Sequence, residues 1–262
     1  MLRAAGATDK GPFRPTNQDR FVVSDDHSII LIADGVGGQN AGDVAASLAV
    51  EAVLEFLVHP ERFGWIFGFD PRLSRTGNLI RSAIQFAHMR VIDAGCHSAE
   101  HGGMATTMVA AIMKEATLSV GCVGDSRLYV RSSGRLRALT VDDTDRSVLT
   151  HAIGAQVRPS VQVVDAMLAD GDVVLLTTDG VHASVGDARL EQLIVAAGTP
   201  DAAARAIVRA AIQSGSRDNC TAVVGKYESD SRESRVESLE SIVESLSRES
   251  WAGVAGRSRL IH

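Results

Sequence analysis

The order of elements along the 262-residue chain predicts an α+β fold. Short apolar runs joined by turns such as Ser132-Ser133-Gly134 indicate antiparallel strands. Helical spacing occurs in two pairs of segments, 40–58 with 78–95 and 187–197 with 199–215, and strands follow each pair. Because strands and helices do not alternate one by one, parallel crossover units are not expected.

The first part of the chain predicts a strand pair and then the first pair of helices. Residues 21–23 are expected to pair with the apolar run that ends at Asp34. In 40–58, polar residues recur at every fourth position, which is typical of an amphipathic helix that lies on a sheet. Asn78 is a candidate N-cap of the second helix, and Gly95 is a candidate stop.

The second part predicts most of the sheet strands and the second pair of helices. The sequence Thr199-Pro200-Asp201 places a capping hydroxyl, a proline and an acidic residue at the start of a helix that ends at Gly215. The expected strands are 106–113, 118–123, 128–130, 136–139, 161–167, 173–176 and 220–225.

Composition excludes several classes of protein. The hydrophobic fraction of 45% and the charged fraction of 22% are ordinary for a globular chain, and the net charge of −6 argues against nucleic acid as a partner. No apolar stretch approaches the roughly 20 residues of a membrane helix, and Met1–Gly6 lacks a signal-peptide core. Cys96, Cys122 and Cys220 fit reduced thiols, so we expect a cytoplasmic protein with no membrane partner.

A change in composition divides the chain into two parts. Residues 1–227 form the predicted folded domain, and 228–262 form a tail rich in Ser, Arg and Glu. Apolar residues from Val236 to Leu246 keep a weak helical spacing. We interpret this segment as a linker with a weakly amphipathic helix.

Four aspartates stand at the ends of predicted strands. Asp34, Asp125 and Asp179 each follow an apolar run, and Asp218 precedes one. Antiparallel strands of one sandwich can bring such ends into a common cleft, and like charges held close are tolerable when cations neutralise them. Without His or Cys at zinc spacing nearby, magnesium or manganese is favoured over zinc.

Six motifs follow one another along the chain. They are Arg14-x-x-Asn17-Gln18-Asp19, Ala33-Asp34-Gly35-Val36-Gly37-Gly38, Gly103-Met104-Ala105-Thr106-Thr107, Gly124-Asp125-Ser126-Arg127, Thr178-Asp179-Gly180 and Asp218-Asn219. Together they resemble the metal-dependent serine/threonine protein phosphatases of type 2C, in a form similar to the bacterial members. The resemblance covers 8–227 and implies a four-layer α-β-β-α sandwich, two antiparallel sheets with a helix pair on each outer face.

The resemblance also implies a metal centre of two Mn²⁺ or Mg²⁺ ions with a possible third. In the family, the match of Asp34 bridges the two ions, and the carbonyl matching Gly35 binds one of them. The carboxylates matching Asp179 and Asp218 bind the other ion. Asp125 matches a ligand of the third, weaker ion, which the match of Asp179 shares.

The implied reaction is hydrolysis of phosphoserine and phosphothreonine on proteins by a water activated between the two ions. The residue matching Asp19 orients that water, and the one matching Arg14 grips the substrate phosphate with a planar guanidinium. The expected partners are phosphorylated proteins and a cognate Ser/Thr kinase, which places the protein in signalling.

The chain departs from the family pattern at two places, and other functions stay open. Val36 stands where some members carry a histidine, and only a short acidic stretch, 142–145, stands where a longer flap is usual. His182 is expected at the surface. The alternatives are a catalytically silent relative that binds phosphoproteins or partners as a scaffold, and a metallohydrolase of small phosphate esters.

Overall fold

The computed structural model describes residues 1–37, 41–145, 148–155 and 158–229. Residues Met1–Glu228 form one compact unit. The predicted helix of the tail lies outside the described residues. Among the helices that the structure describes, none has the length and apolar character needed to cross a lipid bilayer.

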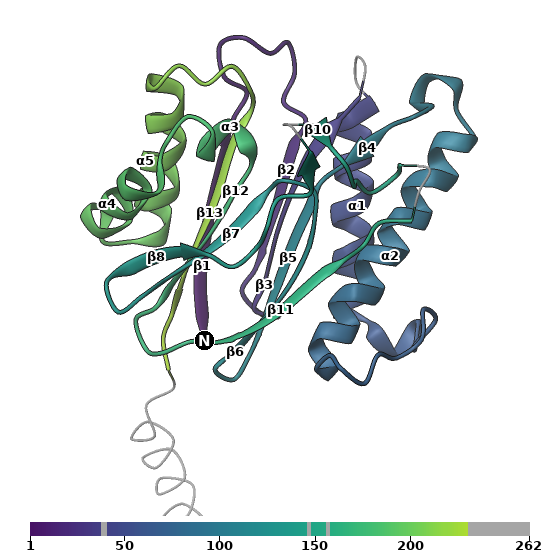
Figure 1. The fold of residues 1–262 in the computed structure, drawn as a ribbon, viewed down its shortest axis with the longest axis horizontal. Coiled ribbons are helices and arrows are strands. Elements are labelled where there is room, and N and C mark those ends of the chain that lie inside the picture. The colour runs from purple at the N-terminus through teal and green to yellow at the C-terminus, as the bar shows by residue number, and fades with distance from the viewer. Residues whose placement is uncertain (38–40, 146–147, 156–157, 230–262) are drawn as a thin grey trace, which may run out of the picture. The chain divides into compact units, whose positions relative to one another are not determined.

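Two antiparallel sheets form the centre of this compact unit (Figure 1). One has the order β1 (Leu2–Asp9), β13 (Cys220–Tyr227), β12 (Val173–Thr177), β7 (Arg127–Ser132), β8 (Arg135–Ala138). The other has the order β11 (Gln162–Met167), β6 (Thr117–Val123), β5 (Met108–Lys114), β3 (Ile29–Val36), β2 (Asp19–Ser24), and β4 (Ala105–Thr106) pairs with β3. A small separate pair joins β9 (Thr144–Asp145) and β10 (Val148–Leu149).

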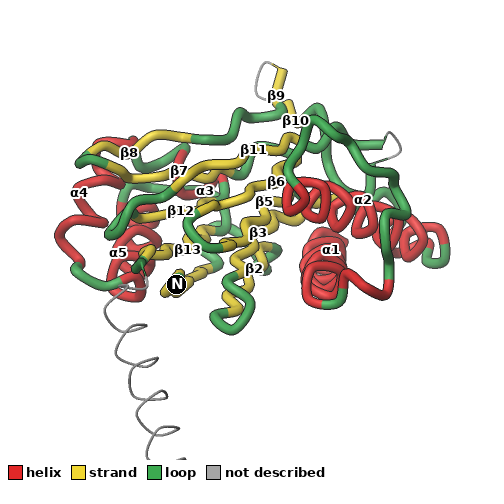
Figure 2. The backbone as a smooth tube through the Cα atoms, turned by 90° about the horizontal axis from the view of Figure 1, so that it is seen from below, coloured by secondary structure: helices red, strands yellow, loops and turns green. Residues whose placement is uncertain are grey.

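Helix pairs cover the outer faces of both sheets (Figure 2). Helices α1 (Ala41–Val58) and α2 (Arg75–Cys96) pack on the sheet that contains β3, and α4 (Asp187–Ala197) and α5 (Pro200–Gln213) pack on the sheet that contains β13. The remaining helical turns are η1 (Pro60–Arg62), η2 (Ala99–His101) and α3 (Asp179–His182). The predicted four-layer α+β sandwich is therefore confirmed.

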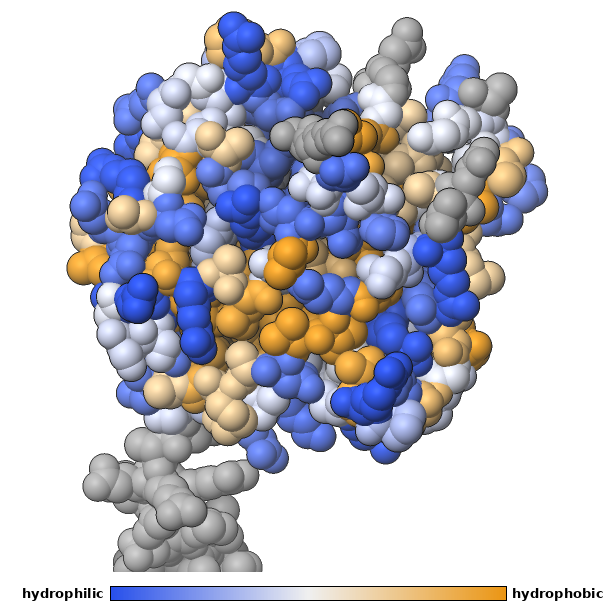
Figure 3. Space-filling view, in the orientation of Figure 1, coloured by the Kyte–Doolittle hydropathy of each residue, from blue (hydrophilic) through white to orange (hydrophobic). Residues whose placement is uncertain are grey.

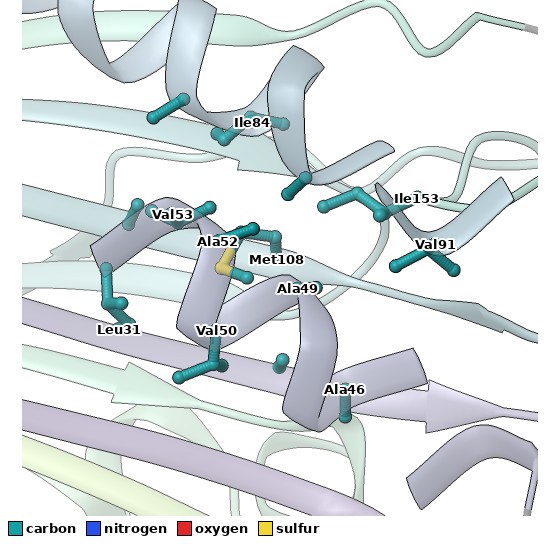
Figure 4. Packing of buried hydrophobic residues seen from close by; sticks show 14 of the residues in the cluster. Leu31, Ala46, Ala49, Val50, Ala52, Val53, Ile84, Val91, Met108 and Ile153 are labelled. Atoms are coloured by element: carbon teal, nitrogen blue, oxygen red, sulfur yellow. The ribbon is translucent and has the colours of Figure 1, made fainter. Parts of the chain in front are cut away.

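The long apolar run of β3 is explained by burial on both of its faces. Side chains alternate along a strand, so Ile29 and Leu31 pack toward α1 and α2, while Ile30 and Ile32 pack between the two sheets. Small residues such as Ala46 and Ala49 let α1 lie close to the sheet (Figure 4). The last residues of β3 are held rigidly by this packing.

Two details of the secondary structure differ from the sequence prediction. β1 was not expected, because Leu2–Asp9 has only one fully buried apolar side chain and no clear alternation. Helix α2 begins earlier than Asn78, since Ser74 is its N-cap and accepts a hydrogen bond from the Gly77 amide. The Asn78 amide instead donates to the carbonyls of Asp70 and Ser74 and fixes the turn before the helix.

Candidate active site

The carboxyl group of Asp34 stands near the end of β3 on a backbone held from two sides. The Asp34 amide donates to the Thr107 hydroxyl at 3.0 Å, and the Asp34 carbonyl accepts from the Thr106 hydroxyl and the Thr107 amide, each at 2.8 Å. Both threonines are buried. They therefore act as supports for the backbone of Asp34.

Asp19 lies opposite Asp34 in the pairing of β2 with β3 and is only 2% exposed. Its Oδ2 atom accepts hydrogen bonds from Thr178 at 2.9 Å and Thr221 at 2.6 Å. Its Oδ1 atom is buried without a partner among the described residues. Burial raises the pKa of Asp19 to about 7, although both hydroxyls lower it.

Asp179 is the first residue of α3, directly after β12. Its carboxyl is close enough to the Asp34 carboxyl for each group to affect the pKa of the other. Burial first, and then neighbouring carboxylates, raise the pKa of both groups. The Oδ1 atom of Asp179 is also buried without a partner in the described part of the chain.

Asp218 reaches the same group from the loop before β13. Its Oδ2 atom accepts a hydrogen bond from the Arg14 guanidinium at 2.5 Å, and this ion pair is partly exposed. The charges of Asp34 and Asp179 also raise the pKa of Arg14, after the hydrogen bond to Asp218, so the guanidinium lies close to all three carboxylates. The loop after β1 and the loop before β13 thus meet at the site.

Asn219 fixes the loop that carries Arg14. Its Oδ1 atom accepts from the Gln18 amide at 2.9 Å, and its Nδ2 atom donates to the carbonyls of Lys10 at 2.8 Å and Thr16 at 3.0 Å. The side chain is buried. Its side-chain hydrogen bonds therefore hold the segment after β1 next to the start of β13.

Gly35 allows the close packing behind Asp34. A Cβ atom at this position would overlap the carbonyl oxygen of Gly42 in α1 and lie 2.9 Å from the carbonyl oxygen of Gln18. These are backbone atoms, so they have little freedom to move away. The position requires glycine for space.

Asp125 lies in the loop between β6 and β7. Burial raises its pKa to about 6, and the charge of Asp179 contributes to the shift. The loop is tied to the acidic 142–145 stretch, because Asp143 accepts a hydrogen bond from the Gly124 amide at 3.0 Å. Arg127 pairs with Asp142 in the same stretch through two hydrogen bonds of 2.8 and 2.7 Å.

The sequence interpretation missed several polar supports of the site. The hydroxyls of Thr178 and Thr221 each donate to Asp19, and the Thr8 hydroxyl bonds to that of Thr221. His182 is half-buried, where a surface position was expected, and its Nδ1 atom lies 3.0 Å from the Thr177 hydroxyl. The sequence did carry a signal for two of these residues. Thr178 stands between an apolar run and Asp179, and Thr221 follows the Asp218-Asn219 motif at the start of another apolar run.

The donor set fits a hard divalent cation. Two buried carboxylate oxygens, one on Asp19 and one on Asp179, have no hydrogen-bond partner among the described residues. The pKa of both carboxyl groups is raised, and a bound cation would lower it again because it stabilises the charged form. Asp218 is turned to Arg14, and within the described residues no three His, Cys, Asp or Glu side chains already form a closed set of metal ligands. Asp218 could therefore bind a metal ion either while it keeps its ion pair with Arg14 or after it releases Arg14.

Comparison with known proteins agrees with this geometry. The family model described as protein phosphatase 2C matches residues 15–241. The chain belongs to the protein phosphatase 2C family. It is accordingly a metal-dependent serine/threonine protein phosphatase that acts on phosphoproteins.

Relatives of this phosphatase come from several bacteria. It is 26% identical over 253 residues to the serine/threonine phosphatase stp of Listeria monocytogenes, covering 85% of this chain and 95% of that one. It is 30% identical over 247 residues to the phosphatase PstP of Mycobacterium tuberculosis, covering 86% of this chain and 45% of that longer protein. The crystal structure of the M. tuberculosis phosphatase superposes with a TM-score of 0.74 at 25% identity, covering 87% and 99% of the two chains.

Proposed function

We propose that this phosphatase hydrolyses phosphoserine and phosphothreonine with water activated between two Mn²⁺ or Mg²⁺ ions held by Asp34, the Gly35 carbonyl, Asp179 and Asp218. The observation that supports this proposal is the meeting of Asp19 and Asp34, on the paired strands β2 and β3, with Asp179 and Asp218 from two later segments, and with the Arg14 guanidinium beside them. Asp125, whose pKa responds to Asp179, is proposed to take part in a third, weaker site.

Bound divalent ions would supply a nucleophilic water near neutral pH and offset negative charge on the phosphoryl oxygens. The side chains of the protein position the attacking water and the substrate. Asp19 is rigid because two hydroxyls hold its Oδ2 atom, so its free Oδ1 atom can accept a hydrogen bond from the attacking water and aim it. Its burial keeps this acceptor away from bulk solvent.

Arg14 is proposed to bind the phosphate of the substrate. A guanidinium has five N–H donors in one plane, so it can hold Asp218 and still offer donors to two phosphate oxygens. Its side chain is half exposed, which leaves it accessible to a phosphorylated segment of another protein. This access favours protein substrates over a metabolite enclosed in a deep pocket.

Hydrolysis of p-nitrophenyl phosphate with Mn²⁺ tests the proposal. Asp34→Asn and Asp179→Asn are expected to lower kcat by at least about a thousandfold and to weaken Mn²⁺ binding in calorimetry. Asp26→Asn, in the exposed turn between β2 and β3, is the matched control and should change neither quantity. Turnover that survives Asp34→Asn would exclude the proposed centre.

Two other functions give different results in the same assays. A scaffold would bind phosphopeptides without releasing phosphate under any divalent ion. A hydrolase of small esters would prefer glycerol phosphate to a phosphothreonine peptide.

We propose that a Ser/Thr kinase forms the substrates of this phosphatase. We also propose a signalling role in the cytoplasm, where the free thiols of Cys96, Cys122 and Cys220 stay reduced.

A further inference from the structure

A cavity of about 520 Å³ opens along α2, outside the carboxylate site. This volume lies within the usual range for pockets that hold small molecules. Apolar and polar side chains both contribute to its wall. The lining residues are Phe67, Gln85, His88, Met89, Ile92, Asp93, Cys96 and Arg158.

Gln85 presents an unsatisfied polar group at this cavity. The residue is only 8% exposed, and its Oε1 atom is buried without a hydrogen-bond partner among the residues that the structure describes. Leaving a buried amide oxygen unpaired costs about 1–3 kcal/mol. A rotation of the Gln85 amide toward the cavity would let an N–H or O–H donor of a ligand remove that cost.

Arg158 supplies a positive charge beside an apolar surface. Its guanidinium carbon lies 5.6 Å from the ring centre of Phe67, and it forms no ion pair with any described residue. Burial lowers the pKa of His88, and the charge of the nearby Arg158 adds to this effect. The wall therefore offers a cation without a described carboxylate partner.

His88 connects the cavity to the candidate active site. Its Nδ1 atom accepts a hydrogen bond from the Gly154 amide at 3.2 Å. The preceding residue, Ile153, packs in the same core cluster as Val91 of α2 (Figure 4) and exchanges two backbone hydrogen bonds with Thr106. The Thr106 hydroxyl donates to the carbonyl of Asp34 at 2.8 Å.

The 152–154 segment has little freedom to move independently of α2. Gly154 has φ +87°, and a Cβ atom there would lie 2.5 Å from the Val91 side chain and 2.6 Å from the Met104 carbonyl oxygen. A shift of His88 would therefore be passed to Ile153 and then to the backbone that supports Asp34.

We propose that this cavity binds a small organic acid and that its occupancy changes the rate of catalysis at Asp34. The acidic group would pair with Arg158, a donor would face Gln85, and an apolar body would lie against Phe67, Met89 and Ile92. The effect on rate depends on the function proposed above, whereas binding to the cavity does not.

The dye 8-anilinonaphthalene-1-sulfonate is a suitable probe, because it combines a sulfonate, an N–H donor and an aromatic body. We expect saturable fluorescence enhancement with the full chain, and about a tenfold or greater rise in Kd for Arg158→Ala and for Gln85→Leu. Arg62→Ala, an exposed arginine of η1, and Gln192→Leu, on α4, are the matched controls and should bind as the parent chain does.

Turnover of p-nitrophenyl phosphate is measured over the same range of dye concentration. The proposal expects a change in kcat that saturates at the fluorescence midpoint and is absent in Arg158→Ala. Equal dye binding by Arg158→Ala and Arg62→Ala would overturn it, and so would binding without any change in turnover. If the parent chain shows no turnover before dye is added, the proposed function has failed, and the variant Kd values alone decide whether the cavity binds the acid.

Discussion

Asp19 and Asp34 are directly opposite each other in the register of β2 and β3. Opposed residues of an antiparallel pair point to the same face, where two like charges destabilise the sheet. The charge of Asp19 is among the causes that raise the pKa of Asp34. Repulsion between the two carboxylates destabilises the protein when no ligand is bound. The pair is therefore better explained by the binding of a ligand than by a contribution to the stability of the fold.

Thr221→Val should destabilise the protein by about 1–3 kcal/mol, because it removes one of two donors to the buried Oδ2 atom of Asp19. Urea unfolding monitored by circular dichroism measures this change. Thr8→Val is the matched control, since Thr8 contacts the Thr221 hydroxyl but not Asp19, and it should cost less than about 1 kcal/mol. Equal losses for both variants would contradict the assigned role of the Thr221 hydroxyl.

Gly35→Ala should destabilise the protein by more than about 3 kcal/mol and abolish turnover, since the added methyl group meets the backbone of Gly42 and Gln18. Gly186→Ala places the same methyl group in open space at the start of α4, and its unfolding free energy should change by less than about 1 kcal/mol. Thermal unfolding and the p-nitrophenyl phosphate assay distinguish the two variants. A stable and active Gly35→Ala protein would show that the backbone contact is not required.

Asn219→Ala should lower kcat/KM by about 10- to 100-fold, because loss of its three hydrogen bonds releases the loop that carries Arg14. The rise in KM should exceed the fall in kcat if Arg14 binds the phosphate. Asn219→Asp keeps the acceptor for Gln18 but loses both donors, so an intermediate effect is expected. Steady-state kinetics at saturating Mn²⁺ gives both constants, and an unchanged KM would argue against this linkage.

Acidification should destabilise the protein through His182. Burial lowers the pKa of this imidazole to about 4 in the folded protein, against 6.5 in the unfolded chain. Between these values the unfolded chain binds the extra proton, so stability falls as pH decreases from about 6.5 to 4, by about 3 kcal/mol at most. Above pH 6.5 this group has no effect on stability.

His182→Asn retains an acceptor for the Thr177 hydroxyl but does not titrate, so its unfolding free energy should depend less on pH within that window. His97→Asn, at an exposed position after α2, should retain the pH dependence of the parent chain. Urea unfolding at pH 4.5, 5.5 and 7 tests both. A parallel pH dependence for His182→Asn and the parent chain would show that the pKa of His182 does not differ between the folded and the unfolded protein.

Sequence patterns predicted the strands that carry the site more reliably than the contacts around it. An apolar run such as Ile29–Ala33 identifies β3 because both of its faces are buried. β1 was missed because its stability comes from pairing with β13, more than 200 residues later, and local periodicity carries no information about such a partner.

The same limit applies to side-chain partners. The link between Asp142 and Arg127 joins residues close in sequence, whereas Asn219 with Lys10 and Thr221 with Asp19 join the two ends of the folded unit. Asn78 was assigned as a cap because of its residue type, but Ser74, one turn earlier, meets the Gly77 amide. The residue type shows which hydrogen bonds a side chain can form, but only the fold determines which neighbour becomes its partner.

The pairing of β1 with β13 has a consequence for the synthesis of this enzyme. The first strand emerges from the ribosome with no partner until Cys220–Tyr227 follows, and Asp218 is delivered at the same late moment. A nascent or prematurely terminated chain that lacks this segment therefore lacks both the partner strand of β1 and the Asp218 carboxylate of the proposed metal centre. The proposed centre would then form only after almost the whole folded unit has been synthesised.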